Sequence, residues 1–187
     1  IAIRNDPYTQ FLQKLGQQLP RPKAILLFTA HWERERLTLS AHNSTYETIY
    51  DFGGFPDEMY QITYPAKGNT EVSKRIQQLL ADNGIKSAFD DKRGLDHGAW
   101  TLLKHLYPDA SIPVVQASIN PFLPAKQQIE IGEALQGLAE HDILIIGSGS
   151  TVHNLRILQW DREEPEEWAM EFDQWLIDQL ASQNKEA

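Results

Sequence analysis

The chain has 187 residues, of which 41% are hydrophobic and 23% are charged, and this composition argues for a folded globular protein and against a disordered one. The formal net charge is −9, from 26 acidic and 17 basic residues, so a phosphate backbone would be repelled and nucleic acid is not expected as a partner. The absence of cysteine excludes disulfides, thiolate metal sites and a cysteine nucleophile. Any bound metal must therefore be held by His, Asp or Glu.

Membrane and export signals are not found in the sequence. No apolar segment approaches the roughly 20 residues that span a bilayer, and the opening IAIRNDPYTQ has no secretory-signal pattern. We therefore expect a soluble, cytoplasmic protein that does not associate with membranes. The chain opens on Ile1 rather than Met and stops at SQNKEA without an obvious final element, so we expect it to be trimmed at both ends.

The first half of the chain predicts one helix, two strands and a loop. Apolar residues at helical spacing after Pro7 indicate a helix that ends at the LPRP break. The segment KAILLFTA (23–30) is short, continuous and apolar, as buried strands are. RLTLSAH (36–42) alternates like a strand with one solvent-facing side, and the adjacent glycines and the proline of YDFGGFPDEMY (50–60) predict an ordered loop.

The second half of the chain alternates helices with strands. Helices are expected over 70–83, 97–107, 124–140 and within 163–181, and strands over 85–89, 112–119 and 142–147. Apolar strands that alternate with helices predict an α/β fold with a mostly parallel or mixed central sheet flanked by helices. No repeat or convincing linker interrupts the pattern, so we expect residues 1–187 to form a single catalytic α/β domain.

Three of the six histidines lie where α/β sheets present functional groups. His31 comes directly after AILLFTA, His153 follows DILII by a few residues, and both positions are carboxyl ends of predicted strands, where ligands gather. Because neutral imidazole commonly binds Fe, Zn, Cu or Ni, these two are candidate metal ligands. His97 opens a helix whose dipole disfavours imidazolium, so it is a candidate proton acceptor. Asp96, the expected N-cap of this helix, carries a charge that acts in the opposite direction, so the direction of the net shift in the pKa of His97 stays open.

Two glycine-containing stretches allow alternative interpretations. GSGSTVHNL (147–155) could cradle a phosphate, but Val152 stands where a dinucleotide fingerprint has its third glycine, and the Gly-Lys-Ser/Thr of a Walker loop is not there. These glycines are better interpreted as a turn that directs His153 into a pocket. YDFGGFP (50–56) could either fill the core or bind an aromatic substrate. In the second interpretation the substrate-binding residues are Tyr50, Phe52, Gly53, Gly54 and Phe55.

Six segments resemble a known family in this order: TAHWE (29–33), YDFGGFP (50–56), YPAKG (64–68), GLDHGAW (94–100), IPVVQASI (112–119) and GSGSTVHNLR (147–156). They are similar to the class III extradiol ring-cleavage dioxygenases of the LigB type, closest to the bacterial 4,5-DOPA extradiol dioxygenase branch. The resemblance covers nearly the whole chain. It implies an α/β fold around a mononuclear non-haem metal, Fe(II) in the active enzymes and Zn(II) as a possible bound metal.

The resemblance also implies residue roles. His31 matches a metal ligand of the family, and His97 matches an active-site histidine near substrate and oxygen. His153 matches a ligand in one branch and an acid/base residue in another, so it is a candidate for both roles. The family's HGSP strand and its C-terminal ligand segment, in a PEH-like motif or as a glutamate, are not in the sequence, so we expect this chain to lack both.

The expected function is a non-haem Fe(II)-dependent extradiol dioxygenase that opens a catechol-type ring, DOPA-like or related, with O2. Its partners would be the small aromatic substrate and O2. Two alternatives remain open. One is a zinc-dependent hydrolase in which the same histidines activate water, and the other is a catalytically inactive binding protein on the same fold.

Overall fold

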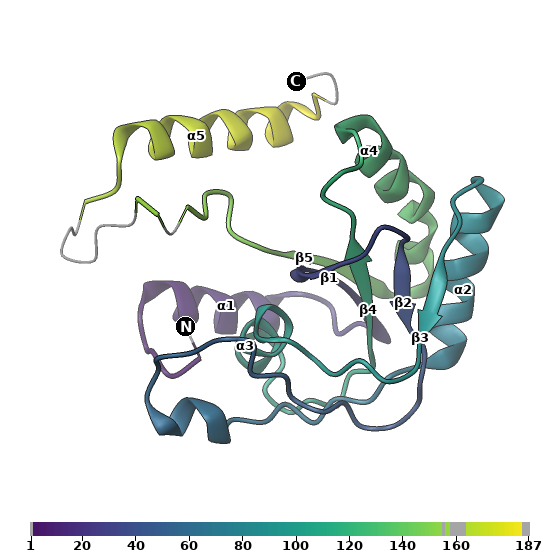
Figure 1. Cartoon of the computed structure of the whole chain (residues 1–187), viewed down its shortest axis with the longest axis horizontal. Helices are drawn as coiled ribbons and strands as arrows, with labels where there is room; N and C mark the ends of the chain where they lie inside the picture. Colours follow the sequence, from purple (N-terminus) through teal and green to yellow (C-terminus); the bar gives the residue numbers. More distant parts are fainter. Residues whose placement is uncertain (1, 155, 158–163, 185–187) are drawn as a thin grey trace. The chain divides into compact units, whose positions relative to one another are not determined.

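The computed structural model describes residues 2–154, 156–157 and 164–184 (Figure 1). The chain divides into two compact units, Ile1–Ser148 and Gly149–Ala187. The first unit contains a five-stranded sheet in the order β3-β2-β4-β1-β5. Its strands are β1 (Ala24–Glu33), β2 (Thr38–Ser40), β3 (Ala88–Asp90), β4 (Val114–Ile119) and β5 (Ile143–Ser148). Its helices are α1 (Pro7–Gln18), α2 (Thr70–Asp82), α3 (His97–Leu106) and α4 (Ala125–Ala134), with the 3-10 helices η1 (Asp57–Gln61) and η2 (Gln136–His141).

The sheet is mixed. Strand β1 runs parallel to both β4 and β5, and β2 runs parallel to β3, whereas β2 and β4 are antiparallel. Helices flank this sheet, so the predicted α/β fold with a mostly parallel or mixed sheet is confirmed.

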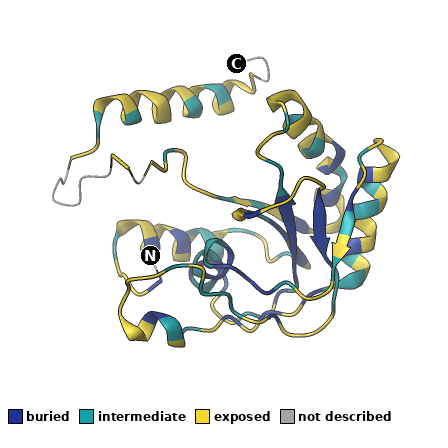
Figure 2. Cartoon of the chain, in the orientation of Figure 1, coloured by how far each residue is buried: buried dark blue, intermediate teal, exposed yellow. Residues whose placement is uncertain are grey.

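Two apolar cores lie on the two faces of the sheet, because side chains of β1 alternate between them. Ile25 and Leu27 pack in a cluster with residues of α1 and α3, and Leu26 packs in a cluster with Ile76 and Leu80 of α2. Figure 2 shows the result: the central strands are buried, and the helices expose their outer sides. The sheet is therefore the middle layer of three, and it fixes where its strand ends and the start of α3 lie.

Several elements differ from the sequence prediction in extent. Strand β1 continues to Glu33, so His31 lies within it rather than directly after it. The predicted solvent-facing side of the second strand is wrong, because all of Thr38–Ser40 is buried between β3 and β4. The predicted helix over 124–140 becomes α4 and η2. The tighter 3-10 turn places residues three apart on one side, which lets Leu135 and Leu138 both be buried.

The second unit contains α5 (Glu167–Ser182), within the segment where a helix was predicted. None of its residues is buried, and the rings of Phe172 and Trp175 stack at a centroid distance of 5.7 Å. None of the helices within the described ranges combines the length and hydropathy that membrane crossing requires.

Two glycines in helices are expected to respond oppositely to substitution by alanine, because one lies at the close contact between α1 and α3 and the other faces open space. A Cβ at Gly16 of α1 would overlap the backbone carbonyl of Leu106 in α3, whereas a Cβ at Gly132 of α4 would meet nothing within 4 Å. Alanine is favoured over glycine by about 0.5–1 kcal/mol inside helices. We therefore expect Gly132→Ala to raise the free energy of unfolding and Gly16→Ala to lower it, measured by urea denaturation. Stabilisation by both variants would contradict the close packing of α1 on α3.

Candidate metal and active site

The carboxyl end of β1 is irregular, and His31 lies in the irregular part. Phe28 of β1 pairs with Ala117 of β4, but the next paired residue, Glu33, is opposite Ile119, so β1 carries extra residues between these two pairs. Extra residues of this kind bend a strand and redirect its side chains. The irregularity explains why β1 outlasts its apolar run and presents His31 at its end, with the side chain 37% exposed.

The start of α3 is built around a fully buried carboxylate, Asp96. As N-cap it accepts a hydrogen bond from the backbone N–H of Ala99 at 3.2 Å. The same oxygen, Oδ1, accepts the hydroxyl of Thr29 at 2.8 Å, and Oδ2 pairs with Nη2 of Arg93 at 2.8 Å. These bonds satisfy a charge that would otherwise be costly to bury. They also place His97, the first residue of the helix, over the end of β1.

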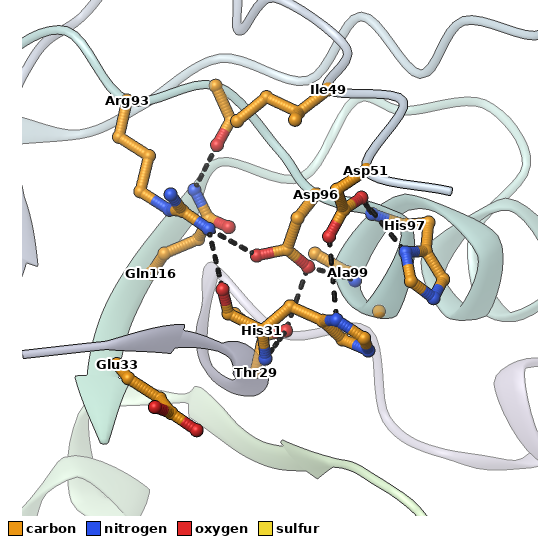
Figure 3. A network of polar contacts seen from close by, with 12 residues as sticks. Thr29, His31, Glu33, Ile49, Asp51, Arg93, Asp96, His97, Ala99 and Gln116 are labelled. Carbon is orange, nitrogen blue, oxygen red and sulfur yellow. Dashed lines mark hydrogen bonds and ion pairs between the residues drawn. The ribbon is translucent and has the colours of Figure 1, made fainter. Parts of the chain in front are cut away.

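The same network holds the backbone of His31 (Figure 3). The N–H of His31 donates to the Thr29 hydroxyl oxygen at 3.2 Å, and Nη2 of Arg93 approaches the His31 carbonyl oxygen at 3.4 Å. The Arg93 guanidinium lies 4.8 Å from the ring centroid of Trp32, which is almost completely buried. Asp96 is thus bonded to both residues that hold the backbone of His31 and directly precedes His97 in the chain.

Three side chains meet at this point: His31 from β1, His97 from α3 and Asp51 from the loop that follows residue 50. One potential ligand atom from each lies within 4.8 Å of the others. Oδ1 of Asp51 is 2.9 Å from both the backbone N and Nδ1 of His97, and Oδ2 is 3.5 Å from Nδ1 of His31. The two imidazole centroids are 4.1 Å apart. All three side chains remain partly open to solvent.

The carboxylate of Asp51 is held in its charged form. Burial is the largest single influence and raises its pKa, but the hydrogen bonds from the backbone N–H and the imidazole of His97 outweigh it. The net result is a pKa below the ordinary value for aspartate. A negative charge is therefore expected beside both imidazoles at neutral pH.

The donor set fits a single divalent metal ion. Imidazole and carboxylate are the ligand types that non-haem Fe(II) oxygenases use, and zinc accepts the same types. Within the described ranges, His31, Asp51 and His97 are the one group of three or more His, Asp or Glu side chains close enough to share an ion. Because the three side chains are partly exposed, an ion held here would also be accessible to a substrate.

The predicted histidines fall into two groups in the structure. His31 and His97, which are far apart in the sequence, are brought into ring contact. His153 belongs to the second unit and its residue is exposed. Its predicted role as a metal ligand or acid/base residue stays a prediction.

The aromatic residues predicted to bind substrate form a cluster that reaches His97 through Phe52. The ring of Phe52 meets the His97 ring edge-on at 5.6 Å, and the exposed Phe55 ring packs on Phe52 at 5.4 Å. Tyr50 contacts Phe52 at 6.1 Å, and its hydroxyl donates to the carbonyl oxygen of Ile62 at 2.9 Å. This hydrogen bond makes Tyr50 an anchor for the loop.

The two glycines between these aromatics form an open turn. Gly54 has φ +76°, a conformation that side chains rarely adopt, and a Cβ at Gly53 or Gly54 would meet nothing within 4 Å. The turn leaves free space beside the aromatic rings. Their role in substrate binding stays a prediction.

Sequence reasoning missed three residues that build this site, Asp51, Thr29 and Arg93, and it missed the partners of a fourth, Asp96. Asp51 is the single acidic residue of YDFGGFP, which could have marked it, but it was read only as part of a glycine-aromatic loop. Asp96 was recognised as a helix cap, yet its bonds to Thr29 and Arg93 were not. Those bonds join segments far apart in the chain, which no local pattern reveals.

Comparison with known proteins extends these observations. Residues 3–187 match the family model described as the catalytic LigB subunit of aromatic ring-opening dioxygenase. Over 177 residues, which is 94% of this chain and 64% of the relative, the sequence is 40% identical to a 4,5-DOPA dioxygenase extradiol of Escherichia coli (strain K12). It is 42% identical to a protein of the same name from Beta vulgaris over 175 residues, 92% of this chain and 65% of the relative.

A solved structure agrees in fold. The crystal structure of an uncharacterized protein from Escherichia coli K12 superimposes with a TM-score of 0.80 and 35% sequence identity, over 95% of this chain and 67% of that chain. The chain spans slightly less than two thirds of the length of the two dioxygenases named above. Because the family model matches almost from end to end, the chain belongs to the LigB family of aromatic ring-opening dioxygenase subunits.

Proposed function

We propose that the protein carrying this chain is a metal-dependent extradiol dioxygenase, which opens a catechol-type ring next to its two hydroxyls with O2. The observation that carries the proposal is the meeting of His31, Asp51 and His97 at one partly exposed point in a chain of the LigB family. Within this group, His31 is proposed as the residue that binds the metal. The relatives named 4,5-DOPA dioxygenase extradiol make DOPA the first substrate to test.

We propose Fe(II) as the metal of the active protein, with Zn(II) as another ion that the site would bind. His31 is the first candidate for the metal ligand, because it matches a ligand position of the family and its ring lies in the His/Asp/His group. His153 is retained as a second candidate ligand. Bound Fe(II) would hold the catechol oxygens and O2 together and let electrons pass between them.

His97 is proposed to move the proton. Asp51 and the start of α3 hold its ring, and the ring remains partly exposed, so its other nitrogen would be open to a catechol hydroxyl. It would take the hydroxyl proton as the substrate binds and return a proton to oxygen later in the reaction. His153 is the alternative residue for this role.

The substrate ring is proposed to lie beside Phe52. This side chain meets His97 edge-on, and Phe55 continues the apolar surface outward. A flat aromatic ring that places its hydroxyls near His97 would contact the Phe52 ring. Tyr50 supports Phe52 from behind, and Gly53 and Gly54 leave space for the substrate.

The proposal is tested with the natural full-length protein reconstituted anaerobically with Fe(II). DOPA, catechol, protocatechuate and gallate are supplied separately, and oxygen uptake and visible absorbance are recorded. We expect oxygen consumption and a yellow ring-opened product with at least one substrate, and neither with zinc-loaded protein. The dioxygenase proposal is wrong if iron-loaded protein leaves all four intact. Hydrolysis of esters or amides by zinc-loaded protein would then favour a hydrolase, and binding without turnover would favour a binding protein.

A further inference from the structure

We infer that Asp51 is a positioning residue. It sets which ring nitrogen His31 presents to the metal and which one His97 presents to the substrate. Its carboxylate contacts the Nδ1 side of both imidazoles. Among the residues that the structure describes, neither Nε2 atom has a hydrogen-bond partner. The inference rests on the proposed function for the use of those Nε2 atoms. The orientation of the rings follows from Asp51 itself.

The contact with His97 determines the tautomer of that ring. A carboxylate only accepts hydrogen bonds, whereas neutral imidazole has one N–H donor and one acceptor nitrogen. Oδ1 of Asp51 lies 2.9 Å from Nδ1 of His97, so Nδ1 carries the proton. The lone pair then resides on Nε2, because the hydrogen bond of one ring nitrogen sets the state of the other. Nε2 of His97 is therefore the atom that accepts a proton from substrate.

The contact with His31 is weaker and has the same sense. Nδ1 of His31 is 3.5 Å from Oδ2 of Asp51, beyond the usual length of an N–H···O hydrogen bond, so the attraction is mainly electrostatic. The second nitrogen of each ring points away from Asp51 (Figure 3). A histidine that binds metal through one nitrogen commonly directs its other N–H at a carboxylate. Nε2 of His31 is therefore the atom available to a metal.

Asp51 is itself held in place, because the segment that precedes it bonds to residues just before and within α3. The backbone N–H of Ile49 donates to the Leu95 carbonyl at 2.7 Å, and Nε1 of Trp100 donates to the Ile49 carbonyl at 3.1 Å. Both contacts tie the segment before Asp51 to the residues around the start of α3. The carboxylate is thus preorganised, which a positioning residue requires.

Direct metal ligation by Asp51 is the competing interpretation, and the hydrogen bonds argue against it. Oδ1 already accepts the backbone N–H of His97, one of the first-turn donors of α3 that has no partner inside the helix. Turning Oδ1 toward an ion would leave both that N–H and Nδ1 of His97 without this acceptor. Ligation by Asp51 would therefore have to use Oδ2, which faces Nδ1 of His31 at 3.5 Å and not its Nε2. The carboxylate therefore lies on the Nδ1 side of both rings, opposite the Nε2 atoms that are assigned to metal and substrate.

The experiment compares Asp51→Ala and Asp51→Asn in the natural full-length protein, with Asp57→Asn at the exposed start of η1 as the matched control. The ring nitrogens of His97 are followed by 15N NMR in metal-free and zinc-loaded protein. We expect Nδ1–H in the wild type and in Asp57→Asn. In Asp51→Ala the Nε2–H form should reappear, and Asp51→Asn should lie between, because its amide can either accept or donate.

Metal content and kinetics complete the test. At saturating metal both Asp51 variants should bind one ion like the wild type, whereas kcat with iron should fall about 10- to 100-fold in Asp51→Ala with little change in KM. Partial recovery in Asp51→Asn is expected.

Three outcomes would overturn the inference: Nε2–H in the wild type, an unchanged tautomer in Asp51→Ala, or loss of the metal in Asp51→Asn, which would make Asp51 a ligand. The inference and the proposed function can fail separately. If the wild type neither binds metal nor consumes oxygen, the proposed function fails, and the tautomer in metal-free protein still decides the role of Asp51.

Discussion

His31→Ala is expected to lose its bound metal. The substitution removes one of the two imidazoles from the His/Asp/His group and takes away the side chain that the end of β1 presents to the ion. We expect the iron or zinc content after gel filtration to fall to background, with no oxygen uptake at any substrate concentration. The measurement is elemental analysis of the full-length protein after reconstitution. Iron content equal to that of the wild type would reject His31 as a ligand.

His97→Ala serves as the contrasting variant. Because His97 is assigned to proton transfer, the metal should remain bound while turnover falls, and loss of a positioned acid/base residue costs about 10²- to 10⁴-fold. His141→Ala, at the end of η2, is the control and should retain both metal and activity. Loss of the metal in His97→Ala would move His97 from the proton-transfer role to the ligand set.

Among the substitutions considered, Asp96→Ala is expected to cause the largest decrease in the free energy of unfolding. It leaves Arg93, whose side chain is only 17% exposed, without its 2.8 Å ion-pair partner. Breaking a buried pair on one side costs about 3–5 kcal/mol, and loss of the N-cap of α3 adds about 1 kcal/mol. We expect the free energy of unfolding in urea to fall by about this sum. The m-value should stay unchanged, because the surface exposed on unfolding is the same.

One further variant separates the charge of Asp96 from its role as helix cap, and a second serves as a control at an exposed ion pair. Asp96→Asn keeps a good capping side chain but removes the charge, so it should retain part of the lost stability. Glu71→Gln breaks an exposed pair with Lys74 at 3.0 Å and should change stability by less than about 1 kcal/mol. If Asp96→Asn is as stable as the wild type, the ion pair with Arg93 does not stabilise the protein.

Local patterns were sufficient for most of the fold. The helix from 97 was predicted because a capping aspartate precedes it, and the same bond from Ala99 to Asp96 is present in the structure. The apolar run of β1 predicted a buried strand, but its last residues, His31 to Glu33, lie beyond that run, and Glu33 is placed by pairing with Ile119 of β4. The extent of β1 could not be predicted because pairing across a sheet is not encoded in adjacent residues.

In the site, too, the residues marked by local patterns were predicted, and those that depend on contacts between distant segments were missed. His31 and His97 were predicted because each stands at an element boundary, which sequence periodicity marks. Asp51 was missed because a single loop carboxylate carries no periodic pattern, and its importance arises from a contact with His97, 46 positions away. Arg93 was missed for the same reason, since it reaches the His31 carbonyl across 62 positions.

These separations have a consequence for the order of events during synthesis. The bond between Thr29 and Asp96 spans 67 positions, and closing so long a loop is slow and entropically costly. While α3 is still inside the ribosome, the backbone of His31 lacks the support of the bond between Thr29 and Asp96, and Asp51 lacks its contact with His97. The ion-binding geometry therefore arises only once β1 and α3 have met, and metal added earlier would encounter separate, weak donors.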